Sequence, residues 1–197
     1  MDVYPNCLKE LILQFSSLPG IGKKTAERLS IHMLNTNKNK IIDFSLALNE
    51  LKDSIKVCEI CFCFIENNCC HICSDVKRDA SLICVVKDPT DIFLIEKSGY
   101  KGKYHVLGGL ISPLDGITPE SLNVDALLNR LNDVDEIIMG IDPSNEGDIT
   151  ILYLSDILKE NDIKISRLAR GIPVGSSLEF IDEVTLTHSI NDRVEMK

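Results

Sequence analysis

The stretch Leu82-Ile83-Cys84-Val85-Val86 decides the fold class, because it is the longest uninterrupted apolar run in the chain. Such a run, rich in β-branched residues, is typical of a strand buried on both faces of a parallel sheet. Residues 136–141 and 164–169 predict two further strands. Strand–helix alternation implies right-handed crossovers and a mostly parallel sheet, and therefore an α/β fold. The elements expected between the strands are a helical stretch around 92–96, short strands at 104–107 and 110–111, and helices near 119–131 and at 147–160.

The composition excludes several classes of protein. The chain has 197 residues, which at roughly 150 residues per domain predicts one or two domains. A hydrophobic fraction of 44% and a charged fraction of 26% exclude wholesale disorder. The run at 82–86 is far shorter than the roughly 18 residues that span a bilayer. The first residues, MDVYPNCLKE, have no signal-peptide pattern, so we expect a cytoplasmic protein without a membrane contact.

The charge is divided unevenly along the chain. The formal net charge of −9 argues against a protein coated in nucleic acid. Residues 1–56 contain eight Lys and Arg against six Asp and Glu, a net charge of +2, whereas the remainder contains 13 against 24, a net charge of −11. The first quarter is therefore able to approach a polyanion, and the rest would repel one or attract a basic partner. A pair of solvated surfaces is the alternative that the charges alone leave open.

The first quarter of the chain has helical periodicity. Apolar residues three or four positions apart predict helices over residues 6–16, 23–34 and 41–55, with a loop at 35–40. A unit of this size buries little core without help. We therefore expect residues 1–56 to pack on a neighbour or on another copy of themselves.

The turn between the first two helices carries a candidate nucleic-acid site. It reads Pro19-Gly20-Ile21-Gly22-Lys23-Lys24 and leads to Arg28. The two glycines allow a tight turn, and the helix that follows offers free N–H groups and a positive dipole end. Such a turn suits a phosphodiester backbone and does not depend on base identity. The candidate DNA-binding residues are Gly20, Gly22, Lys23, Lys24 and Arg28.

This turn has two alternatives to DNA binding. A Pro-Gly turn between helices needs no ligand, and the residues alone leave that alternative open. A nucleotide-binding P-loop is excluded, because Ser17 stands where that motif needs its first Gly. Lys24, rather than Ser or Thr, follows Lys23, and no strand is predicted before the turn.

Eight cysteines are present, and six of them lie between residues 58 and 73. Because the cytosol keeps thiols reduced, this density indicates a metal site rather than disulfides. Two Cys-x-x-Cys knuckles would complete a tetrahedron of thiolates around one structural Zn²⁺ ion. The metal substitutes for the core that so few residues cannot build. The predicted ligands are Cys58, Cys61, Cys70 and Cys73.

Several alternatives to this ligand set stay open. Cys63 and His71 lie in the same segment, and Cys69 could replace Cys70 with a longer spacing. An iron–sulfur cluster is not excluded by the ligand type, whereas a redox pair fits two tandem knuckles poorly. Cys7 and Cys84 lie on apolar faces and are expected to be core residues.

Acidic residues follow the predicted strand 136–141. Asp142, Glu146 and Asp148 lie beyond its carboxyl end, where open α/β sheets usually bind ligands. Together they could hold Mg²⁺, which prefers a few carboxylates plus waters. The spacing favours a simpler alternative, in which Asp142 caps the next helix and the other two stabilise its N-terminus.

Taken in order, these segments resemble one family, the bacterial recombination mediator RecR. The stretch LPGIGKKTAERLS resembles its helix-hairpin-helix, CEIC with CHIC resembles its zinc finger, and residues 81–175 resemble its Toprim domain. YHVLGGLISPLDGI and RLARGIPVGSSLEFIDEVTL are especially characteristic. The sequence itself predicts an irregular tail from residue 177. The domains implied are a helix-hairpin-helix unit (1–56), a zinc finger (57–76), a Toprim domain (80–175) and a C-terminal segment in subunit contacts (176–197).

The resemblance implies a non-enzymatic protein of recombinational DNA repair. RecR proteins form ring-like clamps, as dimers or tetramers, and act with RecO and in many bacteria RecF to load RecA onto single strands coated by SSB. By position, Lys24 and Arg28 match the DNA-contacting residues of the family, and Lys23 stands where Pro is common. Asp142 and Glu146 match the Toprim segment that contributes to RecO contact. The resemblance also implies a nucleoid-associated protein with one Zn²⁺ ion per chain.

The chain departs from the catalytic Toprim pattern at two positions. Lys87 stands where catalytic Toprim domains, and usually RecR proteins, have Glu, and Ser144 replaces the second Asp of an Asp-x-Asp pair. A positive charge at a metal position disfavours two-metal phosphoryl chemistry. The alternative of a Toprim-type magnesium-dependent nuclease or topoisomerase-like enzyme is therefore disfavoured. A zinc-stabilised adaptor that binds only protein stays open.

Overall fold

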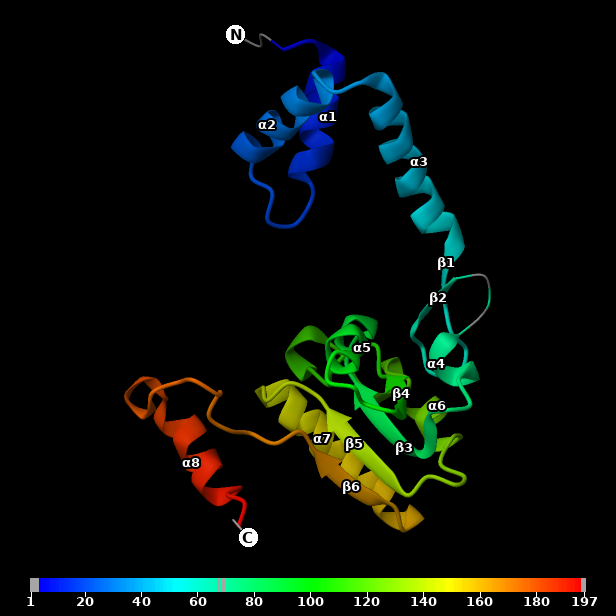
Figure 1. Cartoon of the computed structure of the whole chain (residues 1–197), viewed down its shortest axis with the longest axis vertical. Helices are drawn as coiled ribbons and strands as arrows, with labels where there is room; N and C mark the ends of the chain where they lie inside the picture. Colours follow the sequence, from blue (N-terminus) through cyan, green and yellow to red (C-terminus); the bar gives the residue numbers. More distant parts are fainter. Residues whose placement is uncertain (1–3, 67, 69, 196–197) are drawn as a thin grey trace. The chain divides into compact units, whose positions relative to one another are not determined.

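The chain forms two compact units, Met1–Ile55 and Lys56–Lys197 (Figure 1). The computed structural model describes residues 4–66, 68 and 70–195. No helix within these ranges has the length and apolar character that crossing a bilayer requires.

The first unit consists of three helices. α1 (Asn6–Ser16) and α2 (Lys23–Leu34) pack against each other on either side of the predicted turn, as Figure 1 shows. Asn37 caps α3 (Lys38–Ser54), because its side-chain oxygen accepts the Asn39 N–H at 2.9 Å. The first two predicted helices are confirmed, whereas the third begins inside the loop that the sequence predicts at 35–40.

The core of the first unit is small, as its length predicts. Among its described residues only Ile12, Ala26 and Ser30 are buried, and α3 buries none. Cys7 is exposed along an open groove, so the expectation that it is a core residue is wrong. The apolar side chains that line this groove come from all three helices and include Leu11, Phe15, Met33, Ile41, Phe44 and Leu48.

The second unit is built on a four-stranded parallel sheet in the order β4-β3-β5-β6. The predicted strand at 82–86 is an inner strand, and Cys84 lies opposite Tyr104 on one side and Ile138 on the other. The α/β fold class is therefore confirmed. The strands are β3 (Asp79–Val86), β4 (Gly102–Val106), β5 (Glu136–Gly140) and β6 (Lys164–Arg167).

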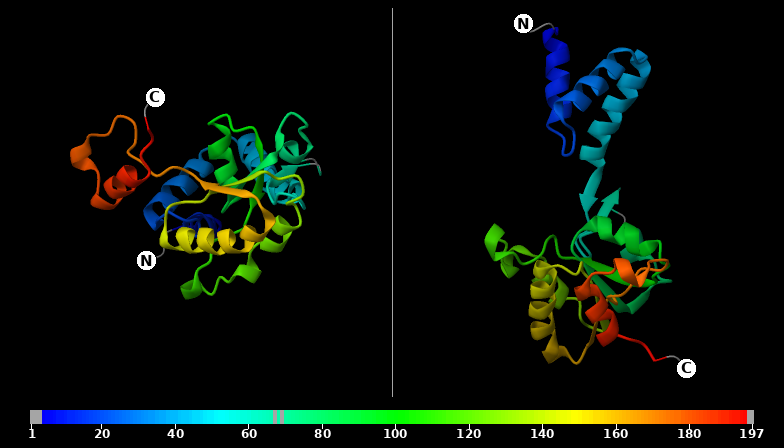
Figure 2. Two further views of the ribbon diagram at one scale, coloured as in Figure 1. Left: turned by 90° about the horizontal axis from the view of Figure 1, so that it is seen from below. Right: turned by 90° about the vertical axis from the view of Figure 1, so that its left-hand side faces the viewer.

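Each face of this sheet has its own core, because successive side chains of a strand point to opposite faces. On one face Val85 and Met139 pack with α6 (Val124–Leu128) and α7 (Asn145–Leu158). On the other, Val86 and Tyr104 pack with α5 (Pro89–Glu96) and with the cysteine segment, residues 55–74. The ribbons in the left view of Figure 2 show α7 (yellow) along one side of the sheet. Cys84 is 1% exposed in this second core, as predicted. The cysteine segment contains β1 (Ile55–Val57), β2 (Phe64–Glu66), which pairs with β1, and α4 (His71–Ser74).

Long-range hydrogen bonds overturn two expectations between the strands. The helix predicted at 119–131 is broken into a 3-10 turn (η2, Pro119–Ser121) and α6. The cause is Asn123, whose backbone N–H and side chain donate to the carbonyls of Leu107 and Val106. Residues 110–111 form no strand, since the Ile111 N–H donates to Thr150 Oγ1 at 2.9 Å.

The tail is not irregular, because it contains α8 (Glu183–Asn191). Asp182 caps this helix, and its carboxylate accepts the Thr185 N–H at 2.8 Å. Asp is a preferred N-cap residue, so a helix that begins after Asp182 agrees with the local sequence. The remaining short 3-10 helices are η1 (Pro113–Asp115), η3 (Lys159–Asn161) and η4 (Leu178–Phe180).

Leu154 and Leu152, both on α7, provide a matched test of the first core face. Leu154 is 0% exposed and Leu152 is 65% exposed. Leu154→Ala should lower the free energy of unfolding by about 2–5 kcal/mol, because it removes buried contacts and leaves a cavity. Leu152→Ala should change it by less than about 0.5 kcal/mol. Urea denaturation followed by circular dichroism measures both, and equal losses would contradict this packing.

Candidate functional site

The four predicted metal ligands come together in the second unit. The sulfur atoms of Cys58, Cys61, Cys70 and Cys73 all lie within 4.8 Å of one another. The Cys58–Cys73 sulfur distance is 4.0 Å, and the Cys61–Cys70 distance is 3.5 Å. A tetrahedral ion with metal–sulfur bonds of about 2.3 Å would place its ligands about 3.8 Å apart. The sulfur positions therefore fit a single tetrahedral ion.

Backbone hydrogen bonds orient the first cysteine of each knuckle. The Ile60 N–H donates to Cys58 Sγ at 3.4 Å, and the Cys73 N–H donates to Cys70 Sγ at the same distance. Cys70 is also the N-cap of α4, which carries Cys73. N–H donors directed at sulfur stabilise thiolates, so both knuckles are prepared for the charge that a metal ligand carries.

Without a cation, the protonated form is favoured for two of the four thiols, Cys61 and Cys70, whereas the pKa of Cys58 is lowered, because hydrogen bonds from backbone N–H groups together outweigh the effect of its burial. A hydrogen bond with Cys73 and burial raise the pKa of Cys61, and burial raises the pKa of Cys70 to about 11. A divalent ion would reverse this preference, because metal binding replaces the protons on the thiols. The donor set of four sulfur atoms is the one that structural zinc sites use.

Of the alternative ligands, the two that the structure describes, Cys63 and His71, do not join this group. Among the described residues, the four cysteines are the only set of three or more His, Cys, Asp or Glu side chains placed to hold a metal ion. Cys63 is 4% exposed, and burial raises its pKa to about 11. His71 is exposed, and Cys69 lies outside the described residues.

The predicted DNA-binding residues surround the turn between α1 and α2 in the first unit. Gly20 has a φ of +77°, a conformation that favours glycine, whereas Gly22 has an ordinary φ of −77° and is the N-cap of α2. A Cβ atom at Gly22 would meet nothing within 4 Å, so packing inside the chain does not require a glycine there. The space beside Gly22 is open to a ligand.

Three exposed cations lie on or just after this turn. Lys23, Lys24 and Arg28 have no ion-pair partner among the residues that the structure describes. Lys23 and Lys24 are the first two residues of α2, so their N–H groups have no acceptor within the helix. The turn therefore presents free cations together with free N–H donors.

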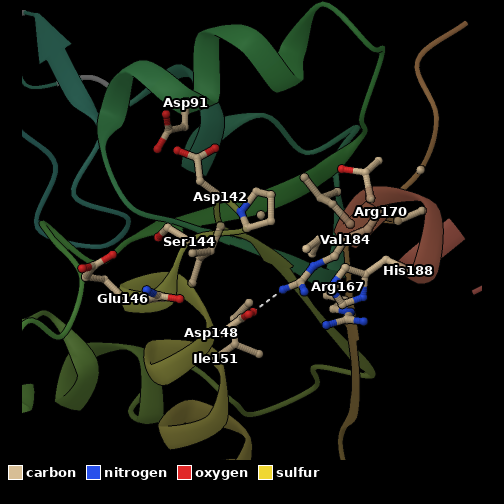
Figure 3. A pocket seen from close by; sticks show the side chains of 18 of the residues that line it. Asp91, Asp142, Ser144, Glu146, Asp148, Ile151, Arg167, Arg170, Val184 and His188 are labelled. Carbon is tan, nitrogen blue, oxygen red and sulfur yellow. Dashed lines mark hydrogen bonds and ion pairs between the residues drawn. The ribbon is translucent and has the colours of Figure 1, made fainter. Parts of the chain in front are cut away.

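The acidic turn after β5 is organised differently from the expectation. Ser144, not Asp142, caps α7, because its Oγ accepts the Gly147 N–H at 3.0 Å. A Cβ atom at Gly147 would lie 2.2 Å from the Asp142 carbonyl oxygen, so this close turn requires glycine. Asp148 pairs with Arg170, as the dashed line in Figure 3 shows.

These carboxylates border a cleft of about 910 Å³ at the carboxyl ends of β5 and β6 (Figure 3). Asp142 and Glu146 are exposed there, but they do not converge on a metal position with Asp148 within the described residues. The sequence interpretation missed the basic side of this cleft, which is lined by Arg167, Arg170 and His188. Arg167 and Arg170 could have been found, since the first lies within the predicted strand 164–169 and the second directly follows it. His188 could not, because α8 was not predicted.

Three family models match consecutive parts of the chain. The model described as "RecR, helix-hairpin-helix" matches residues 8–52, the Toprim domain model matches 81–169, and "RecR, C-terminal" matches 171–194. "Recombination protein RecR" of Staphylococcus aureus (strain Mu3 / ATCC 700698) is 45% identical over 98% of this chain and 99% of its own length. The protein of the same name from Staphylococcus haemolyticus (strain JCSC1435) is 46% identical over the same shares. This chain belongs to the RecR family.

The three matched ranges correspond to separate parts of the structure. The helix-hairpin-helix model covers the turn with Lys23, Lys24 and Arg28, and the Toprim model covers the whole of the sheet from residue 81. The C-terminal model contains α8. The cysteine cluster lies between the first two matched ranges, so its assignment depends on its own geometry.

Cobalt provides a direct test of the cysteine cluster, because thiolate ligands give Co²⁺ a strong near-ultraviolet charge-transfer absorption. We expect the metal-free chain to bind one Co²⁺ ion with this absorption. Cys73→Ser should weaken Co²⁺ binding and lower the absorption per bound ion, because one of four converging sulfur atoms is removed. Cys7→Ser changes an exposed thiol outside the cluster and should keep the parent absorption. A lower absorption in both variants, or in neither, would contradict the ligand set.

Proposed function

We propose that this chain is a DNA-binding recombination mediator of recombinational DNA repair, and that it acts as an assembly factor rather than as an enzyme. The observation that carries the proposal is the set of unpaired cations Lys23, Lys24 and Arg28 at the glycine turn. Membership of the RecR family supports the same role, since its relatives are named recombination proteins. A protein of this kind would associate with the nucleoid.

Contact with DNA is proposed to run through the phosphate backbone. The free N–H groups at the start of α2 and the three cations suit phosphate oxygens, which carry no sequence information. Open space beside Gly22 would let the sugar–phosphate backbone approach the turn closely. Binding should therefore be independent of sequence and strongly dependent on salt.

Charge reversal tests this contact. Lys24→Glu combined with Arg28→Glu should weaken binding to every DNA sequence to a similar degree and reduce the salt slope by about two, because two phosphate contacts are lost. Lys40→Glu, which changes an exposed lysine on α3 of the same unit, is the control and should have a much smaller effect. Fluorescence anisotropy at several salt concentrations measures both. Unchanged affinity in the double variant would leave an adaptor that binds only protein as the better assignment.

Gly22→Ala separates the DNA contact from the fold. Because a Cβ atom there meets nothing within 4 Å, the variant should keep the fold of the parent chain, with at most the small loss of stability that Ala causes at a helix N-cap. Its DNA affinity should fall, since the added methyl group would lie where the phosphate backbone approaches. Equal DNA binding by parent and variant would show that the turn does not approach the backbone at Gly22.

The metal of the cysteine cluster is proposed to be one structural Zn²⁺ ion per chain. Four sulfur ligands leave no open coordination position, so the ion would hold the segment in place and would not act on a substrate. Its ligands would be Cys58, Cys61, Cys70 and Cys73, in agreement with the spacing of their sulfur atoms.

Self-association is proposed to complete the DNA-binding arrangement as a dimer or a tetrameric ring. The groove of the first unit supports this, because its apolar side chains are left open where a unit with a larger core would bury them. Phe44 and Leu48 on α3 are 45% and 54% exposed. A second copy would cover this surface and bring several DNA-binding turns into one assembly.

The acidic turn is proposed to meet a basic protein partner, RecO and in some assemblies RecF, during loading of RecA. Asp142 and Glu146 are exposed at the edge of the cleft and are not taken up by an ion pair among the described residues. An enzymatic role in DNA cleavage is disfavoured by Lys87, which forms an ion pair with Asp88 at 3.4 Å, and by Ser144, which serves as a helix cap. Magnesium-dependent cleavage or relaxation of DNA by the purified chain would overturn the non-enzymatic assignment.

A further inference from the structure

Each cysteine knuckle is held by one cation from the Toprim part of the second unit. Arg130, just beyond α6, donates to the carbonyl of Ile60 in the first knuckle at 3.1 Å. Lys103, on β4, donates to three carbonyls around the second knuckle, those of Ile72, Cys73 and Asp75, at 3.0, 3.2 and 2.9 Å. The two cations therefore contact carbonyls that belong to ligand residues or lie within two positions of one.

Neither cation forms an ion pair with a carboxylate of the residues that the structure describes. Within the described part of the chain, Lys103 and Arg130 are absent from the ion pairs, although both side chains are only half-exposed. The other contacts of Arg130 are the Tyr104 carbonyl and Nδ1 of His105, both at 3.0 Å. Burial lowers the pKa of His105 to about 4, so its ring is neutral and its Nε2–H donates to the Asn123 carbonyl at 2.8 Å.

We propose that Lys103 and Arg130 are positioning residues of the metal centre, which compensate its charge and fasten each knuckle to the Toprim sheet. Four thiolates around Zn²⁺ have a formal charge of −2, and the two cations supply +2. A partly buried charge is costly unless an opposite charge lies nearby. The inference rests on the proposed zinc centre, and it extends that centre to two residues that are 30 and 70 positions away along the chain from the knuckle residues they contact.

The geometry also explains why the two cations lie where they do. The N–H of Val106 donates to the Cys61 carbonyl at 2.9 Å, so β4 already meets the first knuckle through its backbone. The rings of Phe62 and His105 pack edge to face, with their centroids 5.5 Å apart. Lys103 and Arg130 add side-chain hydrogen bonds with the two knuckles to this backbone contact. Retention of the metal should therefore depend on them as well as on the four ligands.

The test measures zinc release from the full chain to a coloured chelator present in excess. Lys103→Gln and Arg130→Gln keep a hydrogen-bond donor but remove the charge, and each should accelerate release or weaken zinc affinity about 10–100-fold. Lys101→Gln removes an exposed charge just before β4 and should release zinc at the parent rate. Lys103→Arg and Arg130→Lys keep the charge and should retain most of the parent behaviour.

The Co²⁺ charge-transfer spectrum gives a second readout that a general loss of stability would not shift. Its band should move in the two Gln variants and stay in place in the charge-conserving ones. If one Gln variant does not fold, the other decides alone. Parent-like release by the Gln variants, or equally fast release by the charge-conserving ones, would overturn the inference. A parent chain that binds no zinc would instead overturn the proposed zinc centre itself, and the inference with it.

Discussion

Strand β4 connects the parallel sheet with the cysteine segment, because each of these two parts of the second unit contacts one edge of the strand. One edge pairs with β3 in parallel register, and the other meets the cysteine segment through the bond from Val106 N–H to the Cys61 carbonyl. An outer strand with free backbone groups invites aggregation. Here the cysteine segment contacts that edge. It therefore makes the edge less available to another chain, and the sheet in turn holds the cysteines in place.

The same contact explains how the two knuckles are held in position although they contain few residues. Cys58, Cys61 and Cys63 belong to one apolar cluster with Val86, Ile92 and Tyr104 of the Toprim part. The segment therefore has a core only because the sheet supplies most of it, and the metal would fix what remains. In this arrangement the cysteine segment is an extension of the sheet rather than an independent finger.

The local patterns could be predicted from the sequence, and the long-range ones could not. The run at 82–86, the two knuckles and the first two helices depend on neighbours within a few residues, and each has the predicted form. The break in the helix at 119–131 depends on carbonyls about 17 positions away from Asn123. Ser144, rather than Asp142, caps α7, because it lies three residues before Gly147, whose N–H its side chain accepts. The sequence alone does not show at which residue the helix begins, and therefore not which side chain caps it. The contacts of Lys103 and Arg130 join residues that no spacing rule connects.

The uneven charge of the two units is explained by which charged side chains form ion pairs and which do not. The first unit has a small net charge, yet the cations at its turn have no partners among the described residues and remain available to a polyanion. In the second unit, acidic groups are engaged by cations at several places, as Asp148 is by Arg170 and Glu136 is by Lys164. Whether cations are free of ion pairs, rather than the net charge of −9, therefore decides which surface can bind DNA. A few free cations bind a phosphate backbone with low affinity, and the total affinity rises when several copies bind the same DNA together. The open apolar groove of the same unit would provide the means of bringing those copies together.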